Sequence, residues 1–286
     1  MEHVVDASVN VSKALSCFRA NGVSTVIRYY NRDMTRKVIR AEEFNAVLAS
    51  GLSLCIVHQR GGRDPAEYGA KNGTLDAAHC RKYGHDLGQP AGSGIYFAVD
   101  FDISSADLNR FVVPYFEAVR AEMANGAALP SYRIGVYGSG LTCRTILDKG
   151  LADFTWLSQS RGFRETPQFR ASNRWNMLQL MPDTLCGVGV DPDIVNPGMK
   201  DFGQFSAAGN AAAGGTGHAG LPRFRVIARD GLRLRSGPGV EFPQLRLLAL
   251  GTLLTEIRRQ GDWSFVDTNG DGPLDGAVHN GFLEPA

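Results

Sequence analysis

The sequence predicts an α/β protein: a (β/α)8 barrel of the TIM type with reduced helices in its last third, followed by a small all-β barrel. Three observations lead to this prediction. Residues 1–204 alternate short apolar runs with longer amphipathic stretches, which is typical of strand–helix repeats. Residues 205–222 contain eleven Ala or Gly among 18 residues, the composition of a linker. Residues 223–286 hold short apolar runs separated by Asp-Gly and Gly-Asp turns, as in small all-β folds.

Eight apolar runs of the first domain are expected to form strands because they are short and rich in Val, Ile, Tyr and Phe. They are residues 4–8, 25–30, 52–58, 94–102, 132–138, 154–159, 175–181 and 190–195. Helices are expected near residues 11–21, 40–50, 74–87, 105–124 and 139–149. Three of these helices end at a glycine, Gly22, Gly51 or Gly150, directly before the next apolar run. Such repeated units favour parallel strands joined by right-handed crossovers.

The last three expected strands are separated by loops too short for full helices, so that side of the barrel should be thinly covered. A doubly wound open sheet is the alternative fold. It would be expected to carry a glycine-rich phosphate-binding turn after the first strand. The sequence there is Asp6-Ala-Ser-Val-Asn, without glycine, which favours the barrel.

The composition excludes several classes of protein. Hydrophobic residues make up 43% and charged residues 21%, as in an ordinary globular chain and unlike a disordered one. A net charge of +1 gives no electrostatic case for nucleic acid, and no apolar run is long enough for membrane insertion. The N-terminus lacks the basic and apolar regions of a signal peptide, which predicts synthesis in the cytoplasm. The five scattered cysteines are expected to be reduced.

Acidic and polar side chains cluster at the expected ends of the strands. In a β/α barrel, functional side chains lie at the C-terminal ends of the strands. Asp100 and Asp102 are two residues apart, so both should face the same side of one strand. The other candidates at strand ends are Asp6 and Asp193, and His58 with Gln59 at the end of the third strand. The expected substrate-binding residues are Arg28, Tyr137, Gln179 and Asp191.

Carboxyl groups in this arrangement suit two kinds of chemistry. Two like charges close together raise one pKa, which suits a general acid, and paired carboxylates cleave glycosidic bonds. Asp6, Asp100, Asp102 and Asp193 could instead supply oxygen ligands to Mg²⁺ or Ca²⁺. No histidine accompanies them at a recognisable spacing, so we expect neither a metal nor another cofactor.

Residues 1–204 resemble a glycoside-hydrolase-like barrel family of largely uncharacterised bacterial proteins, related to the family 25 lysozymes. The matching segments are Val4-Val-Asp6-Ala-Ser, Tyr96-Phe-Ala-Val-Asp100-Phe-Asp102, Ile134-Gly-Val-Tyr137-Gly-Ser, Thr155-Trp-Leu-Ser, Trp175-Asn-Met-Leu-Gln179 and Gly189-Val-Asp191-Pro-Asp193-Ile-Val. Family 25 lysozymes cut the β-1,4 bond after N-acetylmuramic acid in peptidoglycan, and their barrels also lack full helices in the last third.

The resemblance implies a role for each acid. Asp102 stands where the lysozymes have their catalytic Glu and would donate the proton to the leaving oxygen. Asp100 would orient the N-acetyl group of the substrate, while Asp6 and Asp193 would position sugar and water. Asp is one methylene shorter than Glu, and a misplacement of roughly 1 Å can cost on the order of 100-fold in rate. A catalytically inactive glycan-binding protein, or a hydrolase of another glycan, therefore stays open beside a muramidase.

The tail, residues 223–286, resembles a bacterial SH3 domain. The matching segments are Gly231-Leu-Arg-Leu-Arg-Ser-Gly-Pro-Gly-Val, Leu250-Gly-Thr, Gly261-Asp-Trp263-Ser-Phe-Val and Val278-His-Asn-Gly-Phe282-Leu. Such domains commonly bind cell-wall peptides, so the resemblance implies targeting to the wall. Peptidoglycan or a related glycan is the expected partner, with an immunity or inhibitor protein as another. Action in the periplasm or cell wall, or after secretion, is then expected.

Two further segments have patterns that suggest other functions. Residues 267–275 have the Asp and Asn spacing of a Ca²⁺ loop, but Val278 stands where a bidentate Glu is needed, so a polar turn is favoured. Residues 139–143 resemble the Cys peptidases that accompany bacterial SH3 domains. There the cysteine precedes Ser-Gly, whereas Cys143 follows it, so a peptidase is disfavoured.

Overall fold

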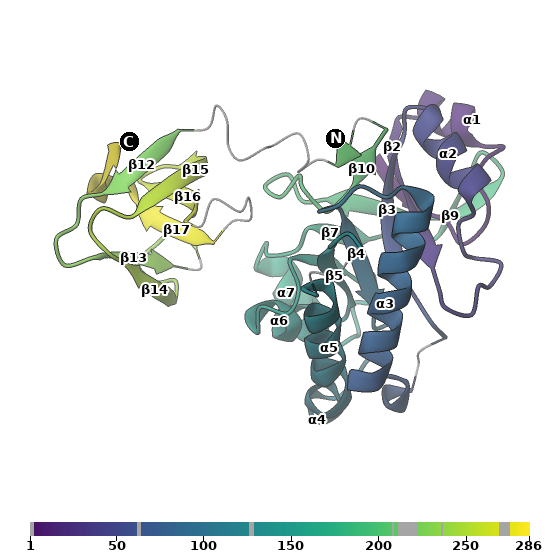
Figure 1. Ribbon diagram of the computed structural model, residues 1–286, viewed down its shortest axis with the longest axis horizontal. Helices are drawn as coiled ribbons and strands as arrows, with labels where there is room; N and C mark the ends of the chain where they lie inside the picture. The colour runs from purple at the N-terminus through teal and green to yellow at the C-terminus, as the bar shows by residue number, and fades with distance from the viewer. Residues whose placement is uncertain are drawn as a thin grey trace. The chain divides into compact units, whose positions relative to one another are not determined.

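The computed structural model describes residues 3–61, 64–125, 129–207, 209–210, 222–235, 237–268 and 275–286. The chain divides into two compact units, Met1–Ala213 and Gly214–Ala286 (Figure 1). Among the described residues, no helix has both the length and the apolar character needed to cross a membrane.

The first unit is mixed α/β, with eight strands closed into a barrel. The strands are β1 (His3–Asp6), β2 (Val23–Tyr30), β3 (Ser53–His58), β4 (Gly94–Ala98), β5 (Arg133–Gly138), β6 (Phe154–Leu157), β7 (Met177–Gln179) and β9 (Val188–Val195). They pair in that order, and β9 closes the ring by pairing with both β7 and β1. This confirms the TIM-like barrel as the architecture of the first unit.

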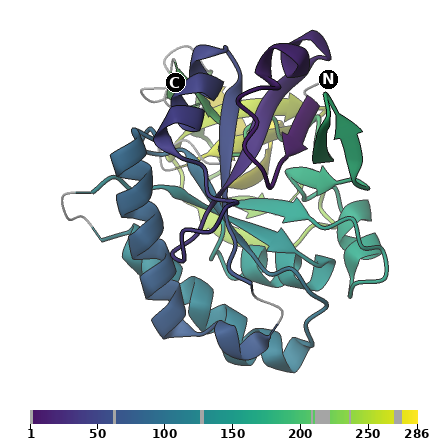
Figure 2. The ribbon, with the colours of Figure 1, turned by 90° about the vertical axis from the view of Figure 1, so that its right-hand side faces the viewer.

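The helices of the first unit lie outside the ring of strands (Figure 2). They are α1 (Leu15–Ala20), α2 (Ala41–Ala49), η1 (Pro65–Glu67), α3 (Ala70–Leu87), α4 (Ser105–Asp107), η2 (Leu108–Val112), α5 (Val113–Met123), α6 (Gly140–Asp148) and α7 (Thr166–Ala171). The long helices α3 and α5 pack side by side. Between β7 and β9 no helix is described, so this side of the barrel is thinly covered.

The direction of the last strand differs from the prediction. The strands β1 to β7 are parallel, but β9 runs antiparallel to both of its neighbours. A hairpin of β8 (Asp183–Leu185) and β9 leads into it. The link from Gln179 to Asp183 is too short for the crossover that a parallel strand requires, so the chain turns back instead.

The barrel has an inner and an outer core, which explains why its strands read as continuous apolar runs. On β2, Ile27 and Tyr29 point into the barrel, where they pack with Tyr96, Trp156 and other large side chains. Val26 and Tyr30 on the same strand point outward to the layer beneath the helices. Buried side chains on both faces replace the alternating pattern of a half-exposed strand.

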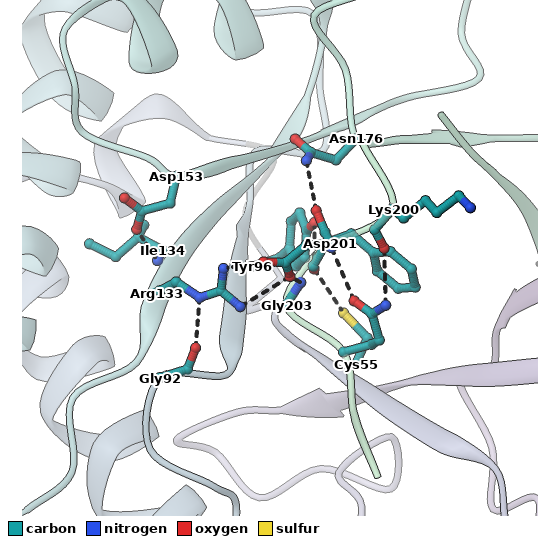
Figure 3. A network of polar contacts seen from close by, with 12 residues as sticks. Cys55, Gly92, Tyr96, Arg133, Ile134, Asp153, Asn176, Lys200, Asp201 and Gly203 are labelled. Atoms are coloured by element: carbon teal, nitrogen blue, oxygen red, sulfur yellow. Dashed lines mark hydrogen bonds and ion pairs between the residues drawn. The ribbon is translucent and has the colours of Figure 1, made fainter. Parts of the chain in front are cut away.

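Residues 201–203, which follow β9, pack against the first residues of β4 and β5 at the end of the barrel where the parallel strands begin (Figure 3). The two terminal nitrogens of the Arg133 guanidinium, Nη1 and Nη2, donate to the Asp201 carboxylate at 2.6 and 3.1 Å. The Tyr96 hydroxyl donates to the carbonyl oxygen of Phe202, which is fully buried inside the barrel. Gly203 passes so close to Gly94 that a Cβ on Gly203 would lie 2.6 Å from the Gly94 Cα. This segment therefore belongs to the barrel core.

The start of the expected linker also belongs to the barrel. Phe205 is buried, and with Ser206 it forms β10 (Phe205–Ser206), which pairs with Leu54 of β3 and with β11 (Gly209–Asn210). The sequence predicts a linker at Phe205 because the residues after it are mostly Ala and Gly. Residues 208 and 211–221 of the expected linker lie outside the described residues.

The prediction that all five cysteines are reduced is wrong. Cys17 on α1 and Cys186 in the β8–β9 turn form a disulfide, 169 residues apart in the sequence. The barrel topology brings both together, because β1 and β9 are neighbouring strands. Cys55, Cys80 and Cys143 are free and buried, as expected of small hydrophobic side chains.

The described part of the second unit is all-β. Its strands are β12 (Arg223–Val226), β13 (Leu232–Arg235), β14 (Gln244–Leu248), β15 (Leu253–Gln260), β16 (Trp263–Asp267), β17 (Gly276–His279) and β18 (Leu283–Pro285), with η3 (Asn280–Phe282). Neighbouring strands are antiparallel, and side chains such as Leu234 and Val266 form a small core. The SH3 assignment stays a prediction. Most of the possible Ca²⁺ loop, residues 269–274, lies outside the described residues.

Candidate active site

A cavity of about 260 Å³ opens where the parallel strands of the barrel end. It is lined by Asp6, Ser8, Tyr29, Lys37, Val57, Gln59, Ala98, Asp100, Tyr137, Trp156, Gln159, Ser160, Gln179 and Asp191. Asp191 reaches it from the antiparallel strand β9, because Asp191 lies directly opposite Asp6 in the β1–β9 register. Functional sites of β/α barrels lie at this end.

Asp6 is the most buried acid in the cavity wall, with 3% of its surface exposed. The Tyr29 hydroxyl donates a 2.7 Å hydrogen bond to Oδ2, while Oδ1 is buried and has no hydrogen-bond partner within the described residues. Burial raises the pKa of Asp6 to about 7, even though the Tyr29 hydrogen bond opposes the rise. Asp6 can therefore hold a proton near neutral pH.

Asp193 lies diagonally across from Asp6 on β9, opposite Val4. The Trp156 indole N–H donates a 2.7 Å hydrogen bond to its Oδ1, and its Oδ2 has no hydrogen-bond partner in the described part of the chain. Burial and the charge of Asp6 raise the pKa of Asp193 well above its usual value. Asp193 is not among the residues that line the cavity. Asp193 is therefore a buried acid near Asp6 that does not belong to the cavity surface.

A hydrogen-bonded chain of side chains runs around the cavity wall. Gln59 Nε2 donates to Asp100 Oδ2 at 3.2 Å, and the Tyr137 hydroxyl lies 3.5 Å from Asp100 Oδ1. The same hydroxyl donates to Gln179 Oε1 at 2.8 Å. Gln179 Nε2 in turn lies 3.5 Å from Asp191 Oδ2. Burial, followed by the charge of Asp100, raises the pKa of Asp191.

Asp102 is not brought into the cavity. Its Oδ1 accepts a 2.7 Å hydrogen bond from the Arg164 backbone N–H, and its Oδ2 forms a 2.7 Å ion pair with the Arg164 guanidinium. The expected strand through Asp102 ends earlier, because β4 stops at Ala98. Beyond the strand, a spacing of two residues no longer keeps Asp100 and Asp102 on one face.

Arg28 also lies away from the cavity. It is completely buried on the outward face of β2, where its Nε donates to Glu43 on α2 at 2.8 Å. A second nitrogen donates to the carbonyl oxygen of Ala7. Because Ile27 and Tyr29 point inward, Arg28 between them must point outward, and it is not among the residues that line the cavity. Arg28 instead ties β2 to α2.

Several cavity residues were not among the predicted site residues, for example Tyr29, Lys37, Trp156 and Gln159. The alternation of side chains along β2 could have identified Tyr29, since it shares a face with the apolar Ile27. Lys37 comes from the loop after β2, and its Nζ donates to Gln59 Oε1 at 3.2 Å. No local sequence signal marks Lys37. Among the described residues, no group of three or more acidic, His or Cys side chains is arranged to hold a metal ion.

Comparison with known proteins places this barrel in a family. The family described as "Rv2525c-like, glycoside hydrolase-like domain" matches residues 16–219. The chain belongs to this family. The match covers most of the barrel but begins after Asp6.

Two curated proteins and a solved structure are also similar to this chain. Two Bacillus subtilis proteins, YbfG and FadG, both described as uncharacterized, are 28% identical over 201 residues and 31% identical over 150 residues, covering 65% and 52% of this chain. The chain spans only about a quarter of their length, 28% and 26%. The crystal structure of the Tat-secreted Rv2525c from Mycobacterium tuberculosis is 24% identical with a TM-score of 0.59, covering 71% of this chain and 98% of that one. This likeness shows a shared fold.

Proposed function

We propose that the barrel is a glycoside hydrolase of the muramidase type, which cleaves the β-1,4 bonds of peptidoglycan with carboxyl groups. One observation carries the proposal: Asp6, whose pKa burial raises to about 7, shares a cavity with Asp100. Glycosidases use two carboxyl groups in different environments, because one can hold a proton and act as the acid while the other stays charged. Membership of a glycoside hydrolase-like family agrees with this chemistry.

The geometry supports a division of roles. Protonated Asp6 donates its proton to the leaving glycosidic oxygen as the bond from that oxygen to the anomeric carbon breaks. A water molecule then adds to the anomeric carbon, and the proton that it loses returns to Asp6. Asp100, held by Gln59, faces the positive charge that develops on the sugar ring or on an assisting N-acetyl group. The contacts of Tyr137 with Gln179 and of Gln179 with Asp191 hold the part of the cavity wall between Asp100 and Asp6. Burial is the main cause of the raised Asp6 pKa, and the charge of Asp191, which lies opposite Asp6, adds to the rise.

One observation favours a second function, binding of a glycan without cleavage. Asp102 occupies the place that the family 25 resemblance gives to the proton donor, yet it is paired with Arg164 outside the cavity. A barrel without an acid at that place could retain its sugar-binding cavity and lack hydrolysis. Pelleting with insoluble peptidoglycan and no soluble product would establish this function.

We also propose that the protein acts outside the cytoplasm. The related Mycobacterium tuberculosis protein is described as Tat-secreted. The Cys17–Cys186 disulfide points the same way, because disulfides persist in oxidising compartments. The all-β unit, if it is an SH3 domain as its sequence suggests, would hold the barrel at the cell wall and raise its local concentration there.

Mass spectrometry of digested peptidoglycan tests the proposed hydrolysis. Purified sacculi are incubated with the wild-type chain, with Asp6→Asn, with Asp100→Asn and with the exposed-surface control Asp183→Asn. We expect soluble fragments ending in reducing N-acetylmuramic acid from the wild type and the control, and their loss in the other two variants. Fragments ending in another sugar would contradict the muramidase assignment.

A further inference from the structure

The loop after β6, residues 158–164, carries a buried side-chain oxygen that accepts no hydrogen bond from any described residue. Gln159 lines the cavity, and its Oε1 atom is buried without a hydrogen-bond partner in the described residues. A buried acceptor left unpaired costs free energy, so native proteins rarely retain one without a reason. Asp6 Oδ1 is a second unpaired buried atom in a residue of the same cavity wall. The cavity thus lacks partners for polar atoms in its own wall.

The same loop is fixed at both ends. At its start, the Ser158 backbone N–H donates to the carbonyl oxygen of Gly138 on β5 at 2.9 Å. At its end, Arg164 is held by Asp102 through the backbone N–H and the guanidinium, both at 2.7 Å. Between them, the Phe163 N–H donates to the carbonyl oxygen of Ser160 and closes a turn. Asp102 therefore acts on the loop that carries Gln159.

We propose that Gln159 is a substrate-binding residue whose side-chain oxygen accepts a hydrogen bond from a sugar hydroxyl or acetamido N–H, and that Asp102 positions it by holding Arg164. This inference rests on the proposed function and adds a contact that selects the substrate. An unpaired acceptor favours ligands that bring donors and disfavours anions that bring only acceptors. The substrate segment at Gln159 is thus a neutral pyranoside that bears hydroxyl or acetamido groups.

The test compares Gln159 variants in binding and in steady-state kinetics. Binding of the N-acetylglucosamine tetramer is measured by calorimetry, and hydrolysis of soluble peptidoglycan strands is followed by release of reducing ends. Gln159→Met keeps the length of the side chain but removes the acceptor, whereas Gln159→Glu keeps an acceptor. Gln168→Met makes the same change at an exposed position on α7 and serves as the control.

We expect Gln159→Met to raise Kd and KM about tenfold, equivalent to about 1.4 kcal/mol, with kcat within about twofold of the wild type. The Kd of Gln159→Glu should stay within about threefold of the wild-type Kd. The Kd and KM of Gln168→Met should equal those of the wild type. A wild-type Kd and KM in Gln159→Met would overturn the role of Gln159. If the wild type binds and cleaves neither saccharide, the proposed function itself fails, so the two failures are distinguishable.

A double-mutant cycle tests the positioning role of Asp102. If Asp102 acts through the loop, Asp102→Ala raises KM in the wild-type background but adds little in the Gln159→Met background. A purely structural role would give the same increment in both backgrounds. Additive effects, or a fall in kcat with unchanged KM in Asp102→Ala, would overturn the proposed route from Asp102 to Gln159.

Discussion

At the scale of single residues, the central feature is an acid whose surroundings raise its pKa to about 7. Asp6 is buried, receives one hydrogen bond from Tyr29 and keeps one oxygen unpaired. These features oppose ionisation more than the hydrogen bond favours it, so the pKa rises to about 7. Such an arrangement reduces stability at the pH where the acid must ionise, as is common where side chains serve a reaction.

Replacing Asp6 should therefore stabilise the protein at high pH. The folded state holds the Asp6 proton to a higher pH than the unfolded chain does, so wild-type stability falls as pH rises from about 4 to about 7. A shift from 3.8 to about 7 corresponds to a loss of up to about 4 kcal/mol. We expect Asp6→Asn to exceed the wild type in free energy of unfolding at pH 8 and to approach it near pH 4, measured by urea titration. Equal differences at both pH values would contradict the raised pKa.

The Tyr29 hydroxyl should tune the pH range of activity. Its hydrogen bond favours the charged form of Asp6, so Tyr29→Phe should raise the pKa of Asp6 further. Because the protonated acid is the active form, the fall in kcat/KM above neutral pH should move to higher pH in this variant. A pH–rate profile of the two proteins measures the shift. A shift to lower pH would exclude Asp6 as the proton donor.

Some of these residues could be predicted from the sequence and others could not. Asp6, Asp100, Tyr137, Gln179 and Asp191 were expected at strand ends, and all of them line the cavity. Asp102 and Arg28 were expected there too. Asp102 lies outside the cavity because its strand ends before it, and Arg28 lies outside because its side chain is on the outward face of β2. A β4 that stops four residues earlier than expected is enough to move Asp102 to the Arg164 loop.

At the scale of elements, the hairpin that ends the barrel matters most. The alternation of apolar runs and glycine-terminated helices predicted most strands and helices of the first unit, because those signals are local. Strand direction depends on the connection before the strand, and the β8–β9 hairpin was not foreseen. It delivers Asp191 and Asp193 to the β1 side of the barrel.

The Cys17–Cys186 disulfide links the β8–β9 hairpin to α1 and should stabilise the folded barrel. It joins residues 169 apart, and a cross-link over so long a loop restricts the unfolded chain strongly. We expect reduction, or the double variant Cys17→Ser/Cys186→Ser, to lower stability by about 2–5 kcal/mol, measured by urea unfolding. Reductant should leave the double variant unchanged, since the three other cysteines are free. A wild type indifferent to reductant would show that the bridge is absent in solution.

At the scale of the whole molecule, the chain combines a glycoside hydrolase-like barrel with a second unit whose described part is all-β. The linker composition predicted two units, but a single aromatic, Phe205, extended the first one into the expected linker. Long-range pairings such as Phe205 with Leu54 and Cys17 with Cys186 have no local signature. The first pairing holds the segment after β9 against the barrel, and the second holds the β8–β9 hairpin, which carries Asp191 and Asp193. The candidate site therefore depends on contacts between residues far apart in the sequence.

The most direct test of this account compares Asp6→Asn and Asp102→Asn in the release of reducing ends from soluble peptidoglycan strands. The account predicts that Asp6→Asn lowers kcat on the order of 10²–10⁴-fold, as loss of a general acid does. Asp102→Asn should act mainly on KM, because Asp102 lies outside the cavity and holds the Gln159 loop. The reverse outcome, an active Asp6→Asn and a kcat lost in Asp102→Asn, would contradict the account and return the proton donor to Asp102.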